Sequence, residues 1–210
     1  MAVLKKYNDN KTMQNITEQV TLTGQYVTLI PLTQEKHDEL VNAIEDGELH
    51  QLWCANVPAP GDLKAEIERR LDLHAQGNML PFTVIDNQKN VAVGMTSYMN
   101  IDDTLPRLEI GSTWYAKSAQ RTPINTETKY LLLEYAFETL GCLAVEIRTH
   151  FLNQQSRRAI ERLGAKLDGV LRNHLRAKNG SMRDTCVYSM ILSEWPAIKN
   201  HLTWLMTKPR

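Results

Sequence analysis

Cysteine is scarce in this sequence, and its scarcity argues against two kinds of small stabilised fold. The three cysteines are Cys54, Cys142 and Cys186. They lie far apart and form no CxxC pair, so neither a disulfide framework nor a zinc site is indicated. The six histidines show no metal-ligand spacing, and no HExxH occurs. We therefore expect no metal, and thiols that are buried in a reducing compartment.

Long apolar runs are also missing. No stretch approaches the roughly 18 apolar residues that a membrane-spanning helix needs. The N-terminal segment, MAVLKKYNDNKTMQN, becomes polar too early for a secretory signal. On these grounds we expect a cytoplasmic protein without a membrane partner.

The chain has no net charge, because 24 basic residues balance 24 acidic ones. Such a balance offers no general attraction to a nucleic-acid backbone, so no nucleic-acid partner is expected. The charges are unevenly spread, however: residues 148–184 contain nine Lys or Arg against three Asp or Glu. This local excess suits a small ligand that carries phosphate. Neither GxGxxG nor a P-loop motif occurs, so dinucleotide-binding and P-loop folds are not supported.

Length and composition fit one globular domain of 210 residues, 42% hydrophobic and 23% charged. Residues 1–19 lack periodicity and predict a loosely held arm, whereas residues 20–196 carry helix and strand patterns. Helices that interrupt a largely antiparallel sheet predict a mixed α+β domain, followed by a helical tail over 197–210. The expected elements are a bent strand or hairpin over 20–32, helices over 34–53 and 62–76, strands over 81–86, 91–100 and 107–115, a helix over 126–140, a strand over 143–151, a helix over 153–163, and a hairpin of 166–176 and 182–192.

Several short strings resemble one family when they are taken together in this order. They are LTG (22–24), VTLIPL (27–32), PFTVID (81–86), VGMTSY (93–98), LEIG (108–111), WY (114–115), NTETKYLLL (125–133), NQQSRRAIERLGA (153–165), RD (183–184), YS (188–189) and EWP (194–196). Each string is weak alone, but their order and separations are specific. The chain resembles the GNAT superfamily of N-acetyltransferases, and within it the RimJ/RimL-type branch, named for ribosomal-protein N-terminal acetyltransferases.

The resemblance implies a twisted, mostly antiparallel sheet that is splayed between its fourth and fifth strands, residues 107–115 and 143–150. It implies an enzyme that moves the acetyl group of acetyl-coenzyme A (acetyl-CoA) to a protein N-terminal α-amine or a small primary amine by direct attack. Two alternatives stay open. One is a detoxifying acetyltransferase for an antibiotic, polyamine or amino-acid analogue, and the other is a non-catalytic CoA-binding module. Dimers are common in this family, so a homodimer is among the expectations.

The resemblance also assigns residues that bind the donor. Asn153 would hold the pantetheine amide, although an N-cap role alone would also explain an Asn at this position. The pantetheine arm would pair with Ile110, Gly111, Ser112 and Thr113, where a backbone N–H would polarise the carbonyl. The residues expected to line the pyrophosphate are Gln120, Arg121, Thr122, Pro123, Asn125 and Thr126, with Arg158 or Lys129 reaching a phosphate.

The phosphate loop departs from the family pattern Q/R-x-x-G-x-G/A, because Pro123 and Asn125 stand at the glycine positions. Glycine lets the backbone approach a pyrophosphate, whereas proline removes one N–H donor. A helix start remains, with Thr122 as a candidate cap, and its free N–H groups and dipole still attract phosphate. We therefore predict that coenzyme binding is modified and not lost.

Two residues are the catalytic candidates that the resemblance implies. Alternation along the strand places Glu109 on the same face as Gly111 and Thr113. The resemblance implies that Glu109 accepts the proton of the amine or orders a water. The alternative for Glu109 is an exposed strand carboxylate without a role. Ser156 would protonate the departing thiolate, because Ile160 stands where many family members carry a tyrosine. A small residue near the start of a helix is the structural alternative for Ser156.

Other prominent polar and aromatic residues are predicted to be structural. Arg183 and Asp184 are expected to form an ion pair, and His150 to be a structural strand histidine. Trp114 and Trp195 are expected to pack in the core.

Overall fold

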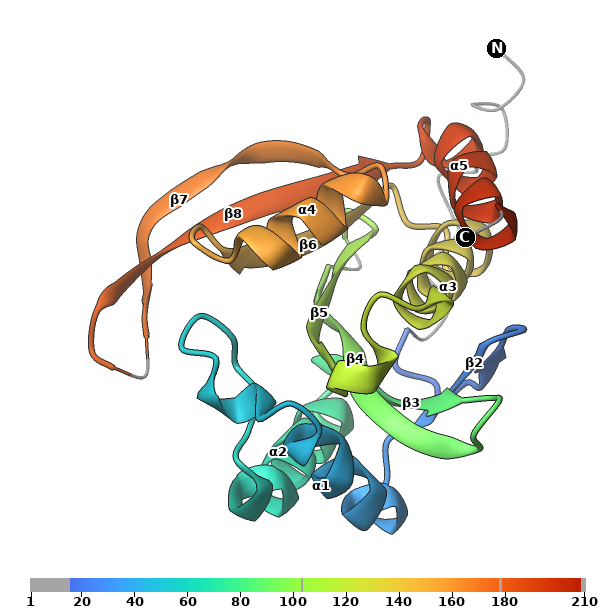
Figure 1. The fold of residues 1–210 in the computed structure, drawn as a ribbon. Coiled ribbons are helices and arrows are strands. Elements are labelled where there is room, and N and C mark those ends of the chain that lie inside the picture. The colour runs from blue at the N-terminus through green and yellow to red at the C-terminus, as the bar shows by residue number, and fades with distance from the viewer. Residues whose placement is uncertain (1–15, 103, 178, 209–210) are drawn as a thin grey trace.

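The computed structural model describes residues 16–102, 104–177 and 179–208. These residues form one eight-stranded sheet in the order β1-β2-β3-β4-β5-β6-β8-β7 (Figure 1). All neighbouring strands are antiparallel except β5 and β6, which are parallel, so the predicted mixed and mostly antiparallel sheet is confirmed. The strands are β1 (Leu22–Thr23), β2 (Val27–Pro31), β3 (Met79–Asp86), β4 (Val91–Asp102), β5 (Arg107–Tyr115), β6 (Ala144–His150), β7 (Lys166–Arg176) and β8 (Met182–Ile191).

Helices cover both faces of this sheet (Figure 1). They are α1 (His37–Glu45), α2 (Leu63–Ala75), α3 (Pro123–Glu134), α4 (Gln154–Arg162) and α5 (Trp195–Thr207). Successive strand residues point to opposite faces. On β4 the Ser97 hydroxyl accepts from Arg70 of α2, while the Tyr98 hydroxyl donates to the Leu132 carbonyl of α3. The sheet therefore has an α2 face and an α3 face.

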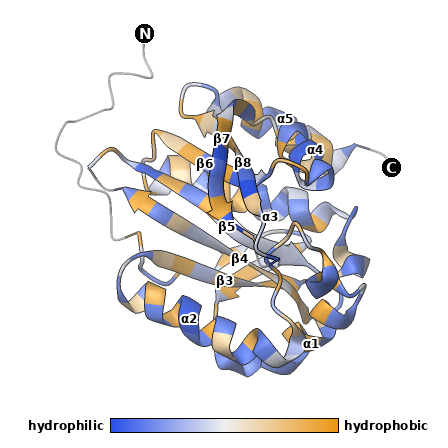
Figure 2. Ribbon diagram, turned by 90° about the vertical axis from the view of Figure 1, so that its left-hand side faces the viewer, coloured by the Kyte–Doolittle hydropathy of each residue, from blue (hydrophilic) through white to orange (hydrophobic). Residues whose placement is uncertain are grey.

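Burial follows from this layering. Every residue of β3 is buried, as expected for a central strand with a helix layer on each side. Leu40, Ala43 and Ile44 form the buried stripe of α1, and Figure 2 shows hydrophilic and hydrophobic residues alternating along α1 and α2. Trp114 and Trp195 are both buried, which confirms their predicted place in the core.

The helix predicted over 34–53 is interrupted. It ends at Glu45, and Gly47 and Glu48 then take left-handed φ angles of 90° and 48° before a 3-10 turn over Leu49–Gln51. A side chain at Gly47 would also collide with Lys117, because its Cβ would lie 2.5 Å from the Cβ of that residue. Glycine is therefore needed at this break.

The helix predicted over 126–140 starts earlier, at Pro123. Its last turn widens into a π-helix over Tyr135–Thr139, and Gly141 follows with a left-handed φ of 74°. The predicted C-terminal cap at Gly141 is thus confirmed. The predicted helical tail begins at Trp195, two residues before its expected start.

Two further observations concern the described residues alone. None of their helices is both long and apolar enough to cross a membrane. Of the three thiols, which form no disulfide, Cys142 and Cys186 are buried and Cys54 is half-buried. Residues 1–15, most of the predicted N-terminal arm, lie outside the described residues.

Candidate active site

The parallel strands β5 and β6 are joined over a short stretch and then part. Three residue pairs connect them, and the last pair is Glu109 with Glu146. Beyond that pair β5 continues to Tyr115 and β6 to His150 without further pairing between them. We call this place the fork, with its closed end at Glu109 and Glu146. The predicted splay is confirmed, and it lies between the two strands that were expected to part.

A β-bulge lies on β5 just past the closed end of the fork. The pairing with β4 skips two residues after Gly111, so that Ser112 and Thr113 together face Thr96. Ser112 has a left-handed φ of 50°, which is unusual for a residue with a side chain. Bulges re-aim the residues that follow them. The sequence predicts that Thr113 lies on the same face of the strand as Glu109 and Gly111. This prediction is wrong for Thr113, because the bulge turns it to the α3 face.

On the α3 face, Thr113 meets a buried lysine. The Nζ of Lys129 lies 2.9 Å from the Oγ1 of Thr113, which is itself 2.8 Å from the Oγ1 of Thr96. Lys129 is 5% exposed, and burial lowers its pKa to about 7. No carboxylate of the described residues pairs with it. This burial contradicts the expectation that Lys129 reaches a phosphate.

Glu109 occupies the closed end of the fork and is 6% exposed. Its Oε2 accepts a hydrogen bond of 2.7 Å from the Nδ2 of Asn100 and lies 3.4 Å from the Nε of Arg148. Burial raises the pKa of Glu109, although the Asn100 bond and the Arg148 charge oppose it. The alternative of an exposed carboxylate is thus wrong. A buried carboxylate with a raised pKa is well suited to accept a proton.

Gly111 leaves room for that carboxylate. A Cβ at this position would lie 2.9 Å from the Oε1 of Glu109 and 2.5 Å from the Sδ of Met99. Gly111 pairs with Ser97, whose hydroxyl meets α2, so Gly111 and Glu109 both lie on the α2 face. The absence of a side chain at Gly111 therefore shapes the surroundings of Glu109.

Arginines neutralise the second carboxylate of the fork. Arg107 and Arg148 both donate to Glu146, the latter through Nη2 at 2.7 Å. Glu109 and Glu146 are paired across the two strands, so two acidic side chains lie close together. The shared Arg148 offsets part of their repulsion, because it contacts both of them.

The predicted ion pair between Arg183 and Asp184 is wrong. Asp184 pairs with Arg172, 2.5 Å away, and also accepts from the backbone N–H of Asn173. Adjacent residues of a strand point to opposite faces, so Arg183 turns away from Asp184.

Helix α3 starts just past the open end of β5. Its cap is Thr122, whose Oγ1 accepts from the N–H of Ile124 at 3.3 Å, and Pro123 is its first residue. The predicted cap and the predicted place of Pro123 are both confirmed. Helix geometry leaves the N–H of Asn125 without an acceptor inside the helix. One backbone donor therefore remains for a ligand at this helix start.

The other residues expected around the phosphates differ in their surroundings. Gln120 donates from Nε2 to the carbonyl of Tyr115 at 3.1 Å, which holds the loop against the end of β5. Arg121 is exposed and has a left-handed φ of 60°. Thr126 is buried, and its hydroxyl accepts from Arg162 at 3.1 Å, so that its side chain is already engaged.

Helix α4 starts just past the open end of β6. Asn153 caps it, because its Oδ1 accepts from the N–H of Ser156 at 3.0 Å. The hydroxyl of the half-buried Ser156 makes no hydrogen bond with any described residue, and Arg158 is exposed. Gln155 donates to the Oε1 of Gln120 at 3.1 Å. This bond joins the first turn of α4 to the loop that leads into α3, so the two helix starts lie side by side.

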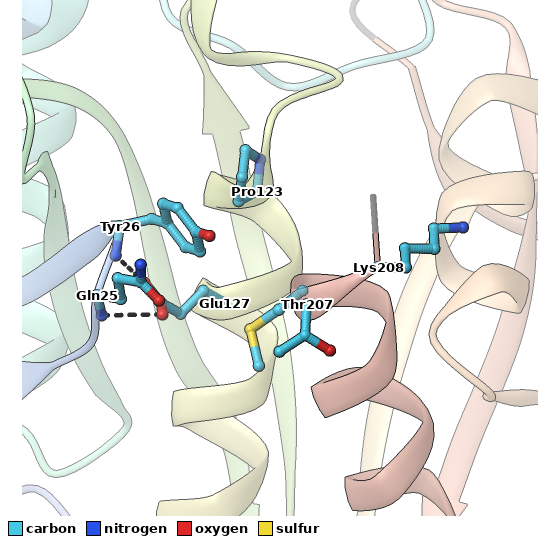
Figure 3. A pocket seen from close by; sticks show the side chains of 7 residues that line it. Gln25, Tyr26, Pro123, Glu127, Thr207 and Lys208 are labelled. Carbon is cyan, nitrogen blue, oxygen red and sulfur yellow. Dashed lines mark hydrogen bonds between the residues drawn. The ribbon is translucent and has the colours of Figure 1, made fainter. Parts of the chain in front are cut away.

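Away from the closed end of the fork, a hollow lies between the β1–β2 turn, the start of α3 and the end of α5 (Figure 3). Its volume is about 480 Å³. Its lining residues are Gln25, Tyr26, Pro123, Glu127, Met206, Thr207 and Lys208. The carboxylate of Glu127 accepts from the backbone N–H groups of Gln25, Tyr26 and Val27, so it serves the turn and not the fork. We assign this hollow no part in the chemistry, since it contains no residue of the fork.

Comparisons with known proteins agree with this geometry. The family described as "Acetyltransferase (GNAT) domain" matches residues 27–166. A Bacillus subtilis (strain 168) protein named "Putative ribosomal N-acetyltransferase YdaF" is 36% identical over 106 residues, which are 50% of this chain and 57% of that protein. The match thus spans little more than half of that relative's length.

Solved structures extend the likeness to nearly the whole chain. A GCN5-related N-acetyltransferase from Brucella melitensis is 34% identical, with a TM-score of 0.80 over 94% of this chain and 90% of that one. Mycobacterium smegmatis RimJ in complex with CoA-disulfide is 19% identical and shares the fold, with a TM-score of 0.76 over 90% of this chain and 96% of that one. The chain therefore belongs to the GNAT family of N-acetyltransferases, enzymes that use acetyl-CoA.

Proposed function

We propose that this protein transfers the acetyl group of acetyl-CoA to a primary amine, which attacks the thioester directly. The observation that carries the proposal is the fork. Its closed end holds the buried carboxylate of Glu109 on the α2 face, and two adjoining helix starts lie just past its open ends. A donor bound along the fork would thus have its phosphates at the helix starts and its thioester near Glu109.

Donor binding relies on the backbone more than on basic side chains. Helix starts attract phosphate through unpaired N–H groups and the helix dipole, and α3 and α4 begin side by side. Pro123 offers no backbone N–H. The backbone N–H of Asn125 and the exposed side chains of Arg121 and Arg158 therefore become more important for holding the phosphates. The RimJ relative was solved with a disulfide of CoA. That ligand belongs to that protein, and it supports the same class of donor here.

The chemistry requires three tasks from this chain. Glu109 accepts the proton of the amine, directly or through a water, so that the nitrogen can bond to the acetyl carbon. Backbone N–H groups next to the bulge, at Gly111, Ser112 and Thr113, polarise the carbonyl oxygen. When the carbon–sulfur bond breaks, the thiolate leaves with the electron pair, and the Ser156 hydroxyl gives it a proton and regains one from water.

The acceptor is a protein N-terminal α-amine or a small amine. The resemblance of the sequence to the RimJ/RimL-type branch supports the former, and so does the name of the Bacillus subtilis relative, "Putative ribosomal N-acetyltransferase YdaF". A detoxifying enzyme for a small amine is the second candidate, because the same fork would serve either acceptor.

Release of free thiol from acetyl-CoA, measured with a panel of peptides and small amines, tests the proposal. We expect thiol release that depends on the acceptor, and mass spectrometry with labelled donor should find one acetyl group on the amine. If the protein binds acetyl-CoA but releases no thiol with any acceptor, it is a coenzyme-binding module and the proposal fails.

A further inference from the structure

A small hollow lies on the α2 face beyond the open end of β6. Its volume is about 50 Å³, enough for a small polar group. The α1–α2 connection reaches toward the tip of the β7–β8 hairpin at this place, as Figure 1 shows. The residues that line the hollow are Trp53, Cys54, Asn56, His150, Leu175, Arg176, Ala177 and Arg183.

Arg183 brings to this hollow a positive charge that is in direct contact with no carboxylate of the described residues. Its Nε is buried without a hydrogen-bond partner, and its guanidinium forms no ion pair with any residue that the structure describes. Arg183 as a whole is half-buried, and a charge that loses part of its solvent is costly unless an opposite charge matches it. Burial accordingly lowers the pKa of Arg183.

The neighbouring acidic groups are engaged by other arginines. Glu146 is bound by Arg107 and Arg148, and Asp184 by Arg172. Glu109 attracts Arg183 through space but forms no ion pair with it. The other arginine that lines the hollow, Arg176, is exposed and donates to the carbonyl of Gly180. Arg183 is thus the arginine of the lining whose side chain forms no hydrogen bond or ion pair with any described residue, and it lies within electrostatic range of the proposed base.

Apolar and polar side chains line the hollow together. Trp53 is 56% exposed, and its ring packs edge-on against the ring of His150, with 5.0 Å between the ring centroids. The Nδ1 of His150 accepts a hydrogen bond from the backbone N–H of Leu152. Two of the residues that line the hollow, Trp53 and Leu175, are large apolar side chains that are exposed to solvent. The guanidinium of Arg183 beside Trp53 and Leu175 fits a ligand that carries one anionic group on an otherwise uncharged body.

We infer that this hollow is a subsite for the acceptor and that Arg183 binds a carboxylate located close to the reacting amine. The inference rests on the proposed function, because it assigns the amine to Glu109 and the carboxylate to Arg183. A guanidinium and a carboxylate form two parallel hydrogen bonds, which fixes the orientation of the acceptor. Two sources share this chemistry: an acidic side chain near a peptide N-terminus, and the α-carboxylate of a free amino acid.

Two matched pairs of acceptors test the inference. The first pair is a short peptide with Asp or Glu at its second position and the same peptide with Asn or Gln at that position. The second pair is an α-amino acid and its carboxamide. Calorimetry with CoA present measures binding without transfer. We expect the carboxylate member of one pair to bind about 10- to 100-fold more tightly than the matched amide.

Variants assign the effect to one residue. Arg183→Gln should abolish the preference for carboxylate, and Arg183→Lys should retain part of it. Arg172→Gln is the matched control, because Arg172 lies on the same hairpin, is 80% exposed and pairs with Asp184. Its preference should equal that of the wild type. Thermal melting of each variant confirms that it is folded.

The results separate the inference from the proposed function. Equal binding of both members in both pairs, no binding of any of them, or a preference that survives in Arg183→Gln would overturn the inference. Thiol release with these same acceptors tests the proposed function independently. A preference seen only with the peptides identifies a protein N-terminus as the source, and one seen only with the amino acid identifies a small acceptor.

Discussion

The side-chain nitrogen of Lys129 lies 2.9 Å from the hydroxyl of Thr113, beneath the bulge of β5. Burial lowers the pKa of this amine to about 7. In the unfolded chain a lysine keeps its proton up to about pH 10.4. Between these two values the unfolded state binds more protons than the folded state, so this residue makes the free energy of unfolding increase with pH.

Lys129→Met removes the titrating group and leaves an apolar side chain in its place. We expect this variant to be more stable than the wild type near neutral pH. The difference should shrink by up to about 1.4 kcal/mol per unit of pH between about pH 7 and about pH 9. Urea unfolding across that range measures it, with the exposed Lys64→Met as the control. A difference that does not change with pH would contradict a buried, titrating amine.

Glu109→Gln tests the proposed base. We expect kcat to fall by about 10²- to 10⁴-fold, because an amide cannot accept the proton of the amine. In the wild type only the ionised carboxylate is active, so kcat/KM should fall as pH falls through the pKa of Glu109. Burial raises that pKa above 4.5, and the acidic limb of the profile should move upward with it. Glu68→Gln, an exposed change on α2, should leave rate and profile unaltered.

Asn100→Ala separates a positioning role from a general structural one. The hydrogen bond from Asn100 stabilises the ionised form of Glu109 and thereby lowers its pKa. Removing the bond should shift the acidic limb of kcat/KM to higher pH, while the rate on the alkaline side should largely recover. A lower rate at every pH, with an unshifted limb, would show that Asn100 does not act through the pKa of Glu109.

Local patterns predict much of the fold because their causes are local. Strand alternation and turn residues place β5 and β7 at the bounds that the structure shows, Arg107–Tyr115 and Lys166–Arg176. Thr122 and Asn153 cap helices as expected, since a cap is a contact between near neighbours. The apolar periodicity alone places the start of α3 too late, at residue 126, because the apolar stripe begins after the cap.

The surroundings of Glu109 could not be predicted in the same way. Asn100 and Arg148 reach it from β4 and β6, so their contacts depend on the order and register of the strands. The bulge at Ser112 has no local signal in the sequence, yet it turns Thr113 toward Lys129. Contacts of this kind appear only once the sheet is assembled.

Glu127→Ala should destabilise the fold without affecting the chemistry directly. The carboxylate accepts from three backbone N–H groups of the β1–β2 turn, at 2.6 to 2.9 Å. Its loss leaves partly buried donors unsatisfied, which should cost about 2–5 kcal/mol. Glu127→Gln keeps one acceptor oxygen and should cost less. Urea unfolding ranks the two variants, and a loss no larger than that of the exposed Glu68→Ala would refute the role of this side chain in holding the turn.

Pro123→Ala tests whether the start of α3 binds the phosphates of the donor. The change adds one backbone N–H in the first turn of the helix, so acetyl-CoA should bind about 2- to 10-fold more tightly if its phosphates lie there. The same change frees the backbone of the unfolded chain and should lower stability by about 0.4–1 kcal/mol. Calorimetry with CoA and urea unfolding measure the two effects separately.

Pro60→Ala is the matched control for this change, because Pro60 starts a 3-10 turn ahead of α2 and lies outside the segments around the fork. It should lose a similar amount of stability and bind the coenzyme as the wild type does. If Pro123→Ala also leaves the Kd unchanged, the added N–H meets no phosphate. The phosphates would then depend on α4 and its exposed Arg158, since the start of α3 would have lost its part in binding them.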